Sequence, residues 1–241
     1  MTRRRVHLPP DRIGDGRAAL DEPARHYLRD VLRLAPGDPV ELFDGRGAAW
    51  EATVGEGFEA LRLGARREAA AGGTEVHLLF ALAKGEKVDL VVQKATELGA
   101  ARLAPFAAER SVVRLDEAKG AERAVRWRRI AEEAARQCGR SDVPEVAAPG
   151  PLAAALAAVP RGFRLVVLHG EGSAPLASVP LEGAPGVAAV VGPEGGLTPE
   201  ELAACEAAGA IRAGLGPRTL RAETAAIAAV ALLQALAGDL R

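Results

Sequence analysis

From residue 74 to its end, the chain alternates apolar runs with helical patterns, and this alternation leaves few folds open to it. Apolar runs occupy residues 76–83, 102–106, 165–168, 187–191 and 211–215. Runs of this length without an alternating polar face are typical of strands that are buried on both sides. Strands that alternate with helices indicate an α/β domain, in which helices cover both faces of a mainly parallel sheet.

Helix signals separate these runs. Lys84-Gly85-Glu86-Lys87 opens a helical pattern that Gly99 closes. Thr198-Pro199-Glu200-Glu201 is a capping box with proline at the first helical position, and that helix stops at Gly209. We also expect helices over 116–139 and 152–159, and an alanine-rich helix over 223–237.

The first seventy residues differ from the rest. Asp21-Glu22-Pro23 reads as a cap and first turn of a helix that ends before Pro36. Residues 40–43 and 49–54 alternate around an Asp-Gly turn and predict a hairpin, and 60–63 predicts another strand. We therefore expect a small, mostly antiparallel β module, with a domain boundary near 69–74. The two expected domains span residues 1–71 and 74–241.

Composition excludes several classes of protein. The two cysteines are far apart and no Cys-x-x-Cys or paired-histidine motif occurs, so we expect no disulfide framework and no bound metal. The longest apolar run, 225–237, is shorter than the ~20 residues that a membrane-spanning helix needs. The basic N-terminal segment lacks the apolar stretch of a signal peptide. The sequence therefore predicts a soluble, cytoplasmic protein with no membrane partner.

Three of the expected strands end in loops rich in glycine, proline and charge: His169-Gly170, then 192–196, then 215–224. Ligands of open parallel sheets bind beyond the carboxyl ends of the strands, so these loops are the expected site. The spacing matches neither a phosphate-binding loop, nor a dinucleotide fingerprint, nor a nucleophile elbow. The pattern favours a neutral or cationic small molecule held by backbone groups. The alternative is that each loop is only a tight turn or a helix cap.

These loops carry a resemblance to a known family. Gly192-Pro193-Glu194-Gly195-Gly196-Leu197 followed by 215–225 resembles the paired motifs of the RsmE family of ribosomal RNA methyltransferases, of the SPOUT class. The likeness extends over the whole chain. Further segments that are similar to family motifs are residues 26–34, 42–45, 94–99, 109–111 and 133–140.

The resemblance implies a fold and an activity. It implies an N-terminal PUA-like β-barrel that binds RNA and a SPOUT domain whose C-terminal segment is threaded into a trefoil knot. It also implies a homodimer. The implied enzyme uses S-adenosylmethionine to methylate N3 of a specific uridine in 16S rRNA, with 16S rRNA or the small ribosomal subunit as its partner. A SPOUT enzyme acting on another RNA such as tRNA, and a ribosome-assembly protein without catalysis, remain alternatives.

Site residues follow from the same resemblance. Arg221 is expected to stabilise the developing negative charge on the uracil, and Glu223 to orient the base or take the N3 proton. For Glu223 a bland alternative is equally open, because a carboxylate in the first turn of a helix is favourable by itself. The residues expected to contact the cofactor are Leu168, His169, Gly170, Gly192, Pro193, Glu194, Gly195, Leu215, Gly216, Leu220 and Arg221.

The protein carries a net charge of −1, but its basic residues are clustered. The N-terminal segment and residues 102–140 are locally basic, as a surface that contacts a phosphate backbone would be. A solvated helix face is the alternative explanation. The candidate phosphate contacts are Arg3, Arg4, Arg5, Arg110, Arg126, Arg129, Arg136 and Arg140.

Overall fold

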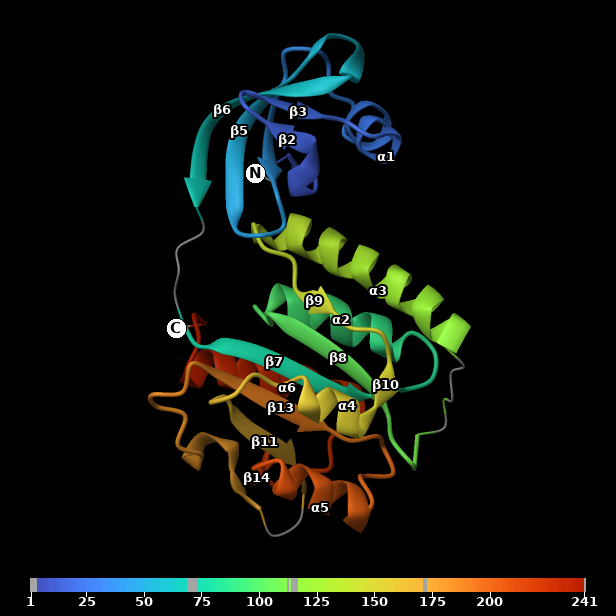
Figure 1. Cartoon of the computed structure of the whole chain (residues 1–241), viewed down its shortest axis with the longest axis vertical. Coiled ribbons are helices and arrows are strands. Elements are labelled where there is room, and N and C mark those ends of the chain that lie inside the picture. Colours follow the sequence, from blue (N-terminus) through green and yellow to red (C-terminus); the bar gives the residue numbers. More distant parts are fainter. Residues whose placement is uncertain (1–3, 69–72, 112, 114–116, 171–172, 241) are drawn as a thin grey trace. The chain divides into compact units, whose positions relative to one another are not determined.

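The computed structural model describes residues 4–68, 73–111, 113, 117–170 and 173–240 (Figure 1). By its internal contacts the chain divides into two compact units. The first comprises residues 1–71 together with 132–143, and the second comprises 72–131 and 144–241. Arg3, a candidate phosphate contact, lies outside the described residues, as do residues 69–72 at the expected domain boundary.

The first unit is built on a six-stranded sheet with the order β1-β4-β5-β6-β3-β2. β1 pairs with β4 in parallel, and the other ladders are antiparallel. The predicted hairpin is present as β4 and β5, but sequence reasoning missed β1, β2 and β3. Since β1 and β2 are the two edges of this order, closure into a barrel stays a prediction. The strands are β1 (Arg5–His7), β2 (Ile13–Gly14), β3 (Arg17–Ala19), β4 (Pro39–Phe43), β5 (Ala48–Val54) and β6 (Ala60–Glu68).

The predicted helix of this unit begins as expected and then widens. The Asp21 carboxylate accepts the Ala24 N–H at 2.9 Å, which caps α1 (Glu22–His26). The chain continues as a π-helical turn, η2 (Tyr27–Val31), and leaves it through Arg33, which has a φ of 53°. The short 3₁₀ turns η1 (Pro10–Arg12) and η3 (Glu56–Phe58) complete the unit.

Arg5 joins β1 to the later segment of the same unit, 132–143. Its side chain is only 2% exposed and makes a 2.6 Å ion pair with Glu41. Its guanidinium also donates to the backbone carbonyls of Ala135, at 3.2 Å, and Arg140, at 2.7 Å. These contacts occupy the donors of Arg5, so the structure removes it from the candidate phosphate contacts and gives it a structural role.

The second unit contains an eight-stranded sheet in which every ladder is parallel, as predicted. The strand order is β10-β8-β7-β13-β11-β14-β12, and β9 pairs with β8. The five long strands match the apolar runs, whereas β9, β10 and β12 are too short to leave a sequence signal. They are β7 (Glu75–Ala81), β8 (Arg102–Ala107), β9 (Glu145–Val146), β10 (Gly150–Pro151), β11 (Arg164–Leu168), β12 (Ala174–Pro175), β13 (Gly186–Val191) and β14 (Ile211–Gly214).

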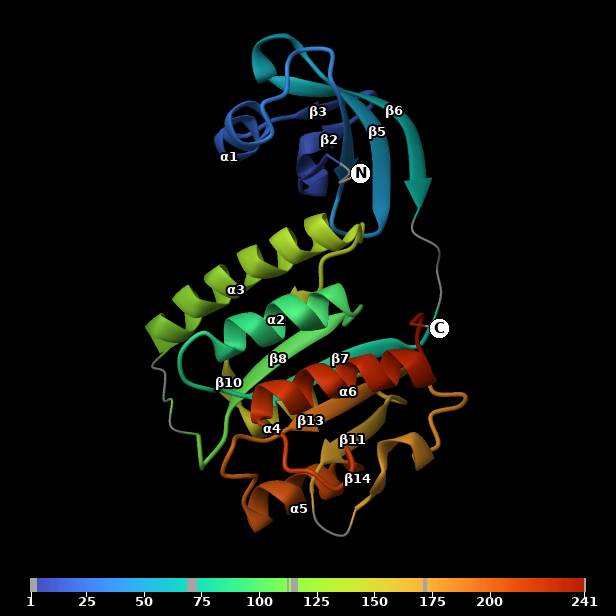
Figure 2. The ribbon, with the colours of Figure 1, turned by 180° about the vertical axis from the view of Figure 1, so that it is seen from behind.

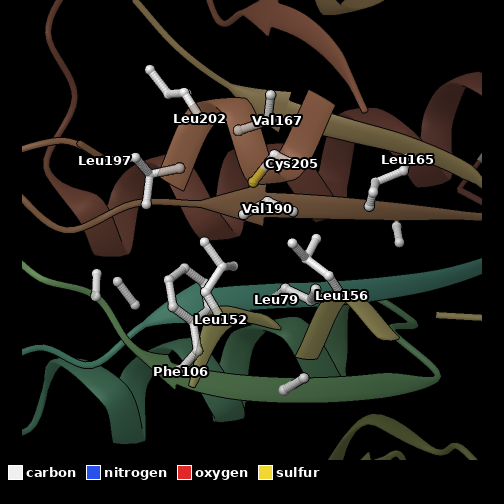
Figure 3. Packing of buried hydrophobic residues seen from close by; sticks show 14 residues of the cluster. Leu79, Phe106, Leu152, Leu156, Leu165, Val167, Val190, Leu197, Leu202 and Cys205 are labelled. Atoms are coloured by element: carbon white, nitrogen blue, oxygen red, sulfur yellow. The ribbon is translucent and has the colours of Figure 1, made fainter. Parts of the chain in front are cut away.

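Helices cover both faces of this sheet, as Figures 1 and 2 show from opposite sides. One face packs on α4 (Leu152–Ala157) and α5 (Pro199–Ala207) through a core that includes Leu79, Phe106 and Cys205 (Figure 3). On the other face α2 (Lys87–Glu97) packs against α6 (Ala222–Leu236). The connection between β13 and α5 ends in the predicted capping box, with both hydrogen bonds present.

The long helix α3 (Glu117–Cys138) starts in the second unit, where it contacts α2. The indole of Trp127 is buried and donates to the Asp89 carboxylate at 3.0 Å. Cys138, the last residue of α3, is exposed. No helix within the described residues is long and apolar enough to cross a membrane. The same residues contain no cluster of three or more potential metal-binding side chains.

Candidate functional site

The three predicted loops leave the sheet at one edge and side by side. Leu168, at the end of β11, pairs with Val191 at the end of β13 and with Ala213 of β14. Val191 in turn pairs with Phe80 near the end of β7. The loops after β11, β13 and β14 therefore start as immediate neighbours, and their side chains share one site.

The loop after β13 has a tight conformation that depends on glycine. A Cβ on Gly192 would lie 2.9 Å from Cγ of Leu197 and 3.2 Å from its backbone nitrogen, so a larger residue would displace the loop. Gly196 adopts a φ of 71° and donates its N–H to the Pro193 carbonyl at 2.8 Å. The loop is thus held in a compact turn that exposes Glu194.

A basic residue from the loop after β8 contacts this turn. The guanidinium of Arg110 donates to the carbonyl oxygen of Gly195 at 3.0 Å. Next to it, the backbone N–H of Glu109 donates to the Glu201 carboxylate at 2.9 Å. Arg110, which the sequence proposed as a phosphate contact, is therefore exposed beside the candidate cofactor loop.

The ammonium group of Lys87 lies between two carboxylates from different loops. Lys87 is the first residue of α2, and its Nζ donates to Oε1 of Glu194. The same Nζ lies 3.5 Å from Oε2 of Glu223, in the first turn of α6. Lys87 therefore connects the start of α2 to the loop after β13 and to the start of α6.

Electrostatics keep this group charged. The hydrogen bond from Lys87 is the main cause that holds the pKa of Glu194 below its ordinary value, with a smaller contribution from Arg221. The same hydrogen bond raises the pKa of Lys87 above its ordinary value. Both groups are consequently ionised at neutral pH.

Glu223 is the least exposed member of the group. Its side chain is 12% exposed, against 45% for Glu194. Its Oε2 is buried and has no hydrogen-bond partner among the described residues. The helix it begins has no side-chain cap, since Arg221 at the N-cap makes no capping hydrogen bond. A buried carboxylate oxygen that has an ion pair at 3.5 Å but accepts no hydrogen bond is a costly feature, and a donor group of a ligand can supply that hydrogen bond.

A small pocket opens at this point, on the face of the sheet that carries α2 and α6. Lys87 and Glu223 provide its charged lining, and the ends of β7 and β13 provide its floor. Its lining residues are Phe80, Ala81, Ala83, Lys87, Val88, Val91, Val191, Gly192, Ala222, Glu223 and Ala226. Apart from Lys87 and Glu223, the lining of this pocket is apolar.

Sequence reasoning missed Lys87. One signal could have identified it, because a cation in the first turn of a helix faces the positive end of the helix dipole. Lys87 occupies such a position, and so it requires acidic partners from elsewhere in the fold. The predicted residue Arg221 is exposed.

The other predicted cofactor contacts border the same edge. Leu168, Leu215 and Leu220 are half-buried, so their side chains present apolar surface that the protein itself does not cover completely. Gly216 has a φ of 102°, which turns the chain away from β14. The hydroxyl of Ser173, beside Gly214, is buried without a hydrogen-bond partner in the described part of the chain. These features form a surface with apolar walls and free polar groups.

The remaining candidate phosphate contacts differ in exposure and in the partners that their guanidinium groups already have. Arg4 is half-exposed and lies 3.7 Å from Asp38, and Arg126 pairs with Asp89 at 2.5 Å. Arg136 lies over the ring of Tyr27 at 4.0 Å, and Arg140 pairs with Asp142 at 2.5 Å with 15% of its side chain exposed. Arg129 is exposed. Arg140 is thus occupied, whereas Arg4, Arg126 and Arg129 offer accessible charge.

Two family models match the chain. One is described as an RNA methyltransferase domain and matches residues 72–234, and the other, an RNA methyltransferase PUA domain, matches residues 20–62. The ribosomal RNA small subunit methyltransferase E of Bacillus subtilis (strain 168) is 33% identical over 221 residues, which cover 86% of each chain. The protein of that name from Mycobacterium tuberculosis is 33% identical over 220 residues, 88% of this chain and 84% of its own.

Solved structures show the same likeness. A ribosomal RNA small subunit methyltransferase E from Neisseria gonorrhoeae, bound to S-adenosyl methionine, superposes with a TM-score of 0.89. It is 29% identical, and the match covers 99% of this chain and 100% of that one. A putative methyltransferase from Legionella pneumophila in complex with the bound cofactor SAM gives a TM-score of 0.88 at 31% identity, covering 98% of both chains.

Proposed function

The chain belongs to the RNA methyltransferase family, in the group named ribosomal RNA small subunit methyltransferase E, and on this premise we propose that it methylates N3 of a uridine in 16S rRNA. The methyl donor is S-adenosylmethionine, which is bound in solved structures of its relatives. The observation that supports the uracil proposal is the buried Oε2 of Glu223, which accepts no hydrogen bond from the described residues and lies 3.5 Å from the Lys87 ammonium group, at an apolar pocket beside Gly192.

The residues at the strand ends fit this cofactor. Half-buried Leu168, Leu215 and Leu220 offer apolar surface for the adenine ring, and the glycines allow its edge to approach backbone groups. The unpaired hydroxyl of Ser173 provides a further polar group in the same region. The ionised Glu194 suits a ligand that carries positive charge. When bound, S-adenosylmethionine supplies a methyl group from a sulfonium centre.

The chain's own residues would then accept the N3 proton of the uracil and stabilise its negative charge. Its N3 carries a proton at neutral pH, so transfer of a methyl group to N3 requires a group that accepts this proton or stabilises the uracil anion. Glu223 accepts the N3 proton through its carboxylate, and the exposed guanidinium of Arg221 stabilises negative charge on the adjacent uracil oxygen. Lys87 fixes the position of Glu223 through the ion pair between its ammonium group and Oε2 of the carboxylate, at 3.5 Å.

Methyl transfer to a defined RNA tests the proposal. The protein is incubated with S-adenosylmethionine and either naked 16S rRNA or small subunits from a strain that lacks the modification. We expect N3-methyluridine at one position, identified by mass spectrometry of nuclease fragments. We expect Glu223→Gln to lower the rate by about 10²- to 10⁴-fold while cofactor affinity is retained. Methylation of another base, or a normal rate for Glu223→Gln, contradicts the proposal.

The path of the chain after β14 supports the knotted topology that we propose for the second domain. In the sheet, β14 pairs with β11 on the side away from β13, whereas α6 packs on β7, β13 and α2. Residues 215–221 must therefore cross the carboxyl ends of β11 and β13, and we propose that they are threaded there. We further propose that residues 1–71 form the RNA-binding PUA-like barrel, that 74–241 form the catalytic domain, and that the protein acts in the cytoplasm as a homodimer.

A further inference from the structure

The helical segment of the first unit ends in an unusual way. Arg33 adopts a φ of 53°, in the left-handed region that L-residues with side chains rarely occupy. This conformation reverses the chain, so that the N–H of Leu34 donates to the carbonyl of Leu28 at 3.0 Å and closes the π-helical turn η2. Arg33 thus stands at a helix end where glycine is the ordinary choice.

The same chain uses glycine for this purpose elsewhere. α2, α3 and α5 are followed by Gly99, Gly139 and Gly209, with φ values of 90°, 93° and 89°. After two of them the next N–H reaches back by five residues, from Ala100 to Ala95 and from Ala210 to Cys205, at 2.9 Å each, whereas Leu34 reaches back by six. An arginine therefore stands where three other helices of this chain are followed by glycine, and the backbone conformation of this arginine is strained.

Packing within the protein does not explain why the residue at position 33 carries a large side chain. Phe58 is the other residue with a side chain and a positive φ in the described parts of the chain. Phe58 is 9% exposed and belongs to the core of the first unit, so burial compensates for its strain. Arg33 is exposed, and no described residue forms an ion pair or hydrogen bond with its guanidinium.

The charges around Arg33 are already paired with one another. Asp30 is held by His26 at 2.8 Å and by Arg29 at 3.1 Å. Two residues before Arg33, the apolar side chain of Val31 is 57% exposed. The end of this helical segment therefore presents an unpaired cation next to uncovered apolar surface.

We infer that the guanidinium of Arg33 binds a phosphate of the RNA substrate, with Val31 packing against the adjacent nucleoside, and that this contact accounts for an arginine at a strained position. The inference rests on the proposed function, in which the protein binds ribosomal RNA. Both residues lie within the segment that matches the RNA methyltransferase PUA domain, which favours RNA over an acidic protein as the partner. A guanidinium beside apolar surface fits a phosphate and its attached ribose.

Arg33→Gly separates the two properties, since it should change stability and binding in opposite directions. Glycine relieves the backbone strain, so we expect the Tm to rise by about 2–4 °C. Binding to in-vitro transcribed 16S rRNA should weaken roughly three- to tenfold. The slope of log affinity against log salt concentration should fall by about 0.7 to 0.9, as expected for one lost phosphate contact.

Two matched variants complete the experiment. Arg33→Lys keeps the charge and should retain the salt slope. Arg66→Gln removes an exposed arginine of the same unit that is already paired with Glu68 at 2.6 Å, and it should leave the slope unchanged. Unchanged affinity and slope for Arg33→Gly, or a loss of stability, overturns the inference. If the wild-type protein fails to bind or methylate 16S rRNA, the proposed function is at fault instead.

Discussion

Lys87 is the first residue of α2, where the helix dipole disfavours a cation. Its contacts with Glu194 and Glu223 compensate for this, and they hold two loops of the candidate site in place. Lys87→Met preserves the length of the side chain and removes its charge, so Glu223 loses its ion pair with Lys87. We expect kcat to fall by about ten- to a hundredfold, measured with saturating S-adenosylmethionine and saturating RNA.

Lys84→Met is the matched control, because Lys84 is an exposed lysine three residues earlier, at the turn before α2. It should retain wild-type kcat, and Lys87→Arg should recover part of the lost rate because it restores the charge. Turnover of Lys87→Met within about twofold of wild type would show that Lys87 does not position Glu223 for catalysis.

The two cysteines should differ sharply in reactivity. Cys205 lies in the core between the sheet and α5, and its burial, followed by repulsion from Glu201 and Glu206, raises the pKa of its thiol to about 11. Cys138 is exposed at the end of α3. Because the thiolate is the reactive form, the native protein should react with one equivalent of a thiol reagent at pH 8 and with two after denaturation. Rapid reaction of two thiols in the native state would contradict this.

The same shift predicts how stability depends on pH. The pKa of Cys205 is higher in the folded state than its ordinary value of 9.0. The contribution of Cys205 to the free energy of unfolding is therefore complete below pH 9. This contribution falls by about 2 kcal/mol as the pH rises toward 11. Urea unfolding at pH 8 and pH 10.5, with Cys205→Ala as the reference, measures the difference. An equal decline in both proteins would assign it to other groups.

At the level of single residues, the sequence allowed the candidate site to be proposed where its residues form a local pattern. The glycine-rich loop and the start of α6 were both recognisable, because special backbone and charge stand together in the chain. Lys87 was missed because its partner Glu194 is 107 residues away, and nothing local encodes that contact. Arg5 was misjudged for the same reason, since its carbonyl partners lie 130 and 135 residues away.

At the level of elements, length decides what can be predicted. The five long parallel strands and α2, α3, α5 and α6 follow from periodicity and caps. The three strands of two residues in the second unit are too short to show an alternation of apolar and polar residues. The segment that forms β1 to β3 contains arginines and prolines that obscure such an alternation. The π-helical turn after α1 depends on backbone geometry at Arg33, which a helical pattern cannot express.

At the same level, we make a prediction about the oligomeric state from the outer face of α6. Leu232 and Leu236 are each 42% exposed on this helix, and Leu90 on the adjacent α2 is 41% exposed. Exposed apolar side chains on two packed helices are typical of an interface between subunits. We expect the protein to be a dimer by light scattering, and the double variant Leu232→Glu, Leu236→Glu to be a folded monomer at micromolar concentration.

Val125→Glu provides the control for that experiment. Val125 is 48% exposed on α3, so it tests whether any exposed apolar residue gives the same effect. The control should remain dimeric. A wild-type monomer, or a double variant that stays dimeric, would show that this face is not the interface.

At the scale of the whole molecule, the site depends on segments that are distant in sequence but meet at one edge of the sheet. The loops after β11, β13 and β14, together with the starts of α2 and α6, come from across some 140 residues, on the order of a complete domain. A cofactor that touches several of these loops binds only the folded state. Cofactor binding should therefore be visible as a gain in global stability.

We expect S-adenosylmethionine at about 100 times its Kd to stabilise the protein by about 2.7 kcal/mol, which raises the Tm by about 5–10 °C in calorimetry. Gly192→Ala should lose most of this gain, because the added Cβ would lie 2.9 Å from Leu197 and displace the loop after β13. Gly150→Ala meets no atom within 4 Å and should keep the full gain. If the cofactor raises the Tm of Gly192→Ala as much as that of the wild type, the loop after β13 does not hold the cofactor.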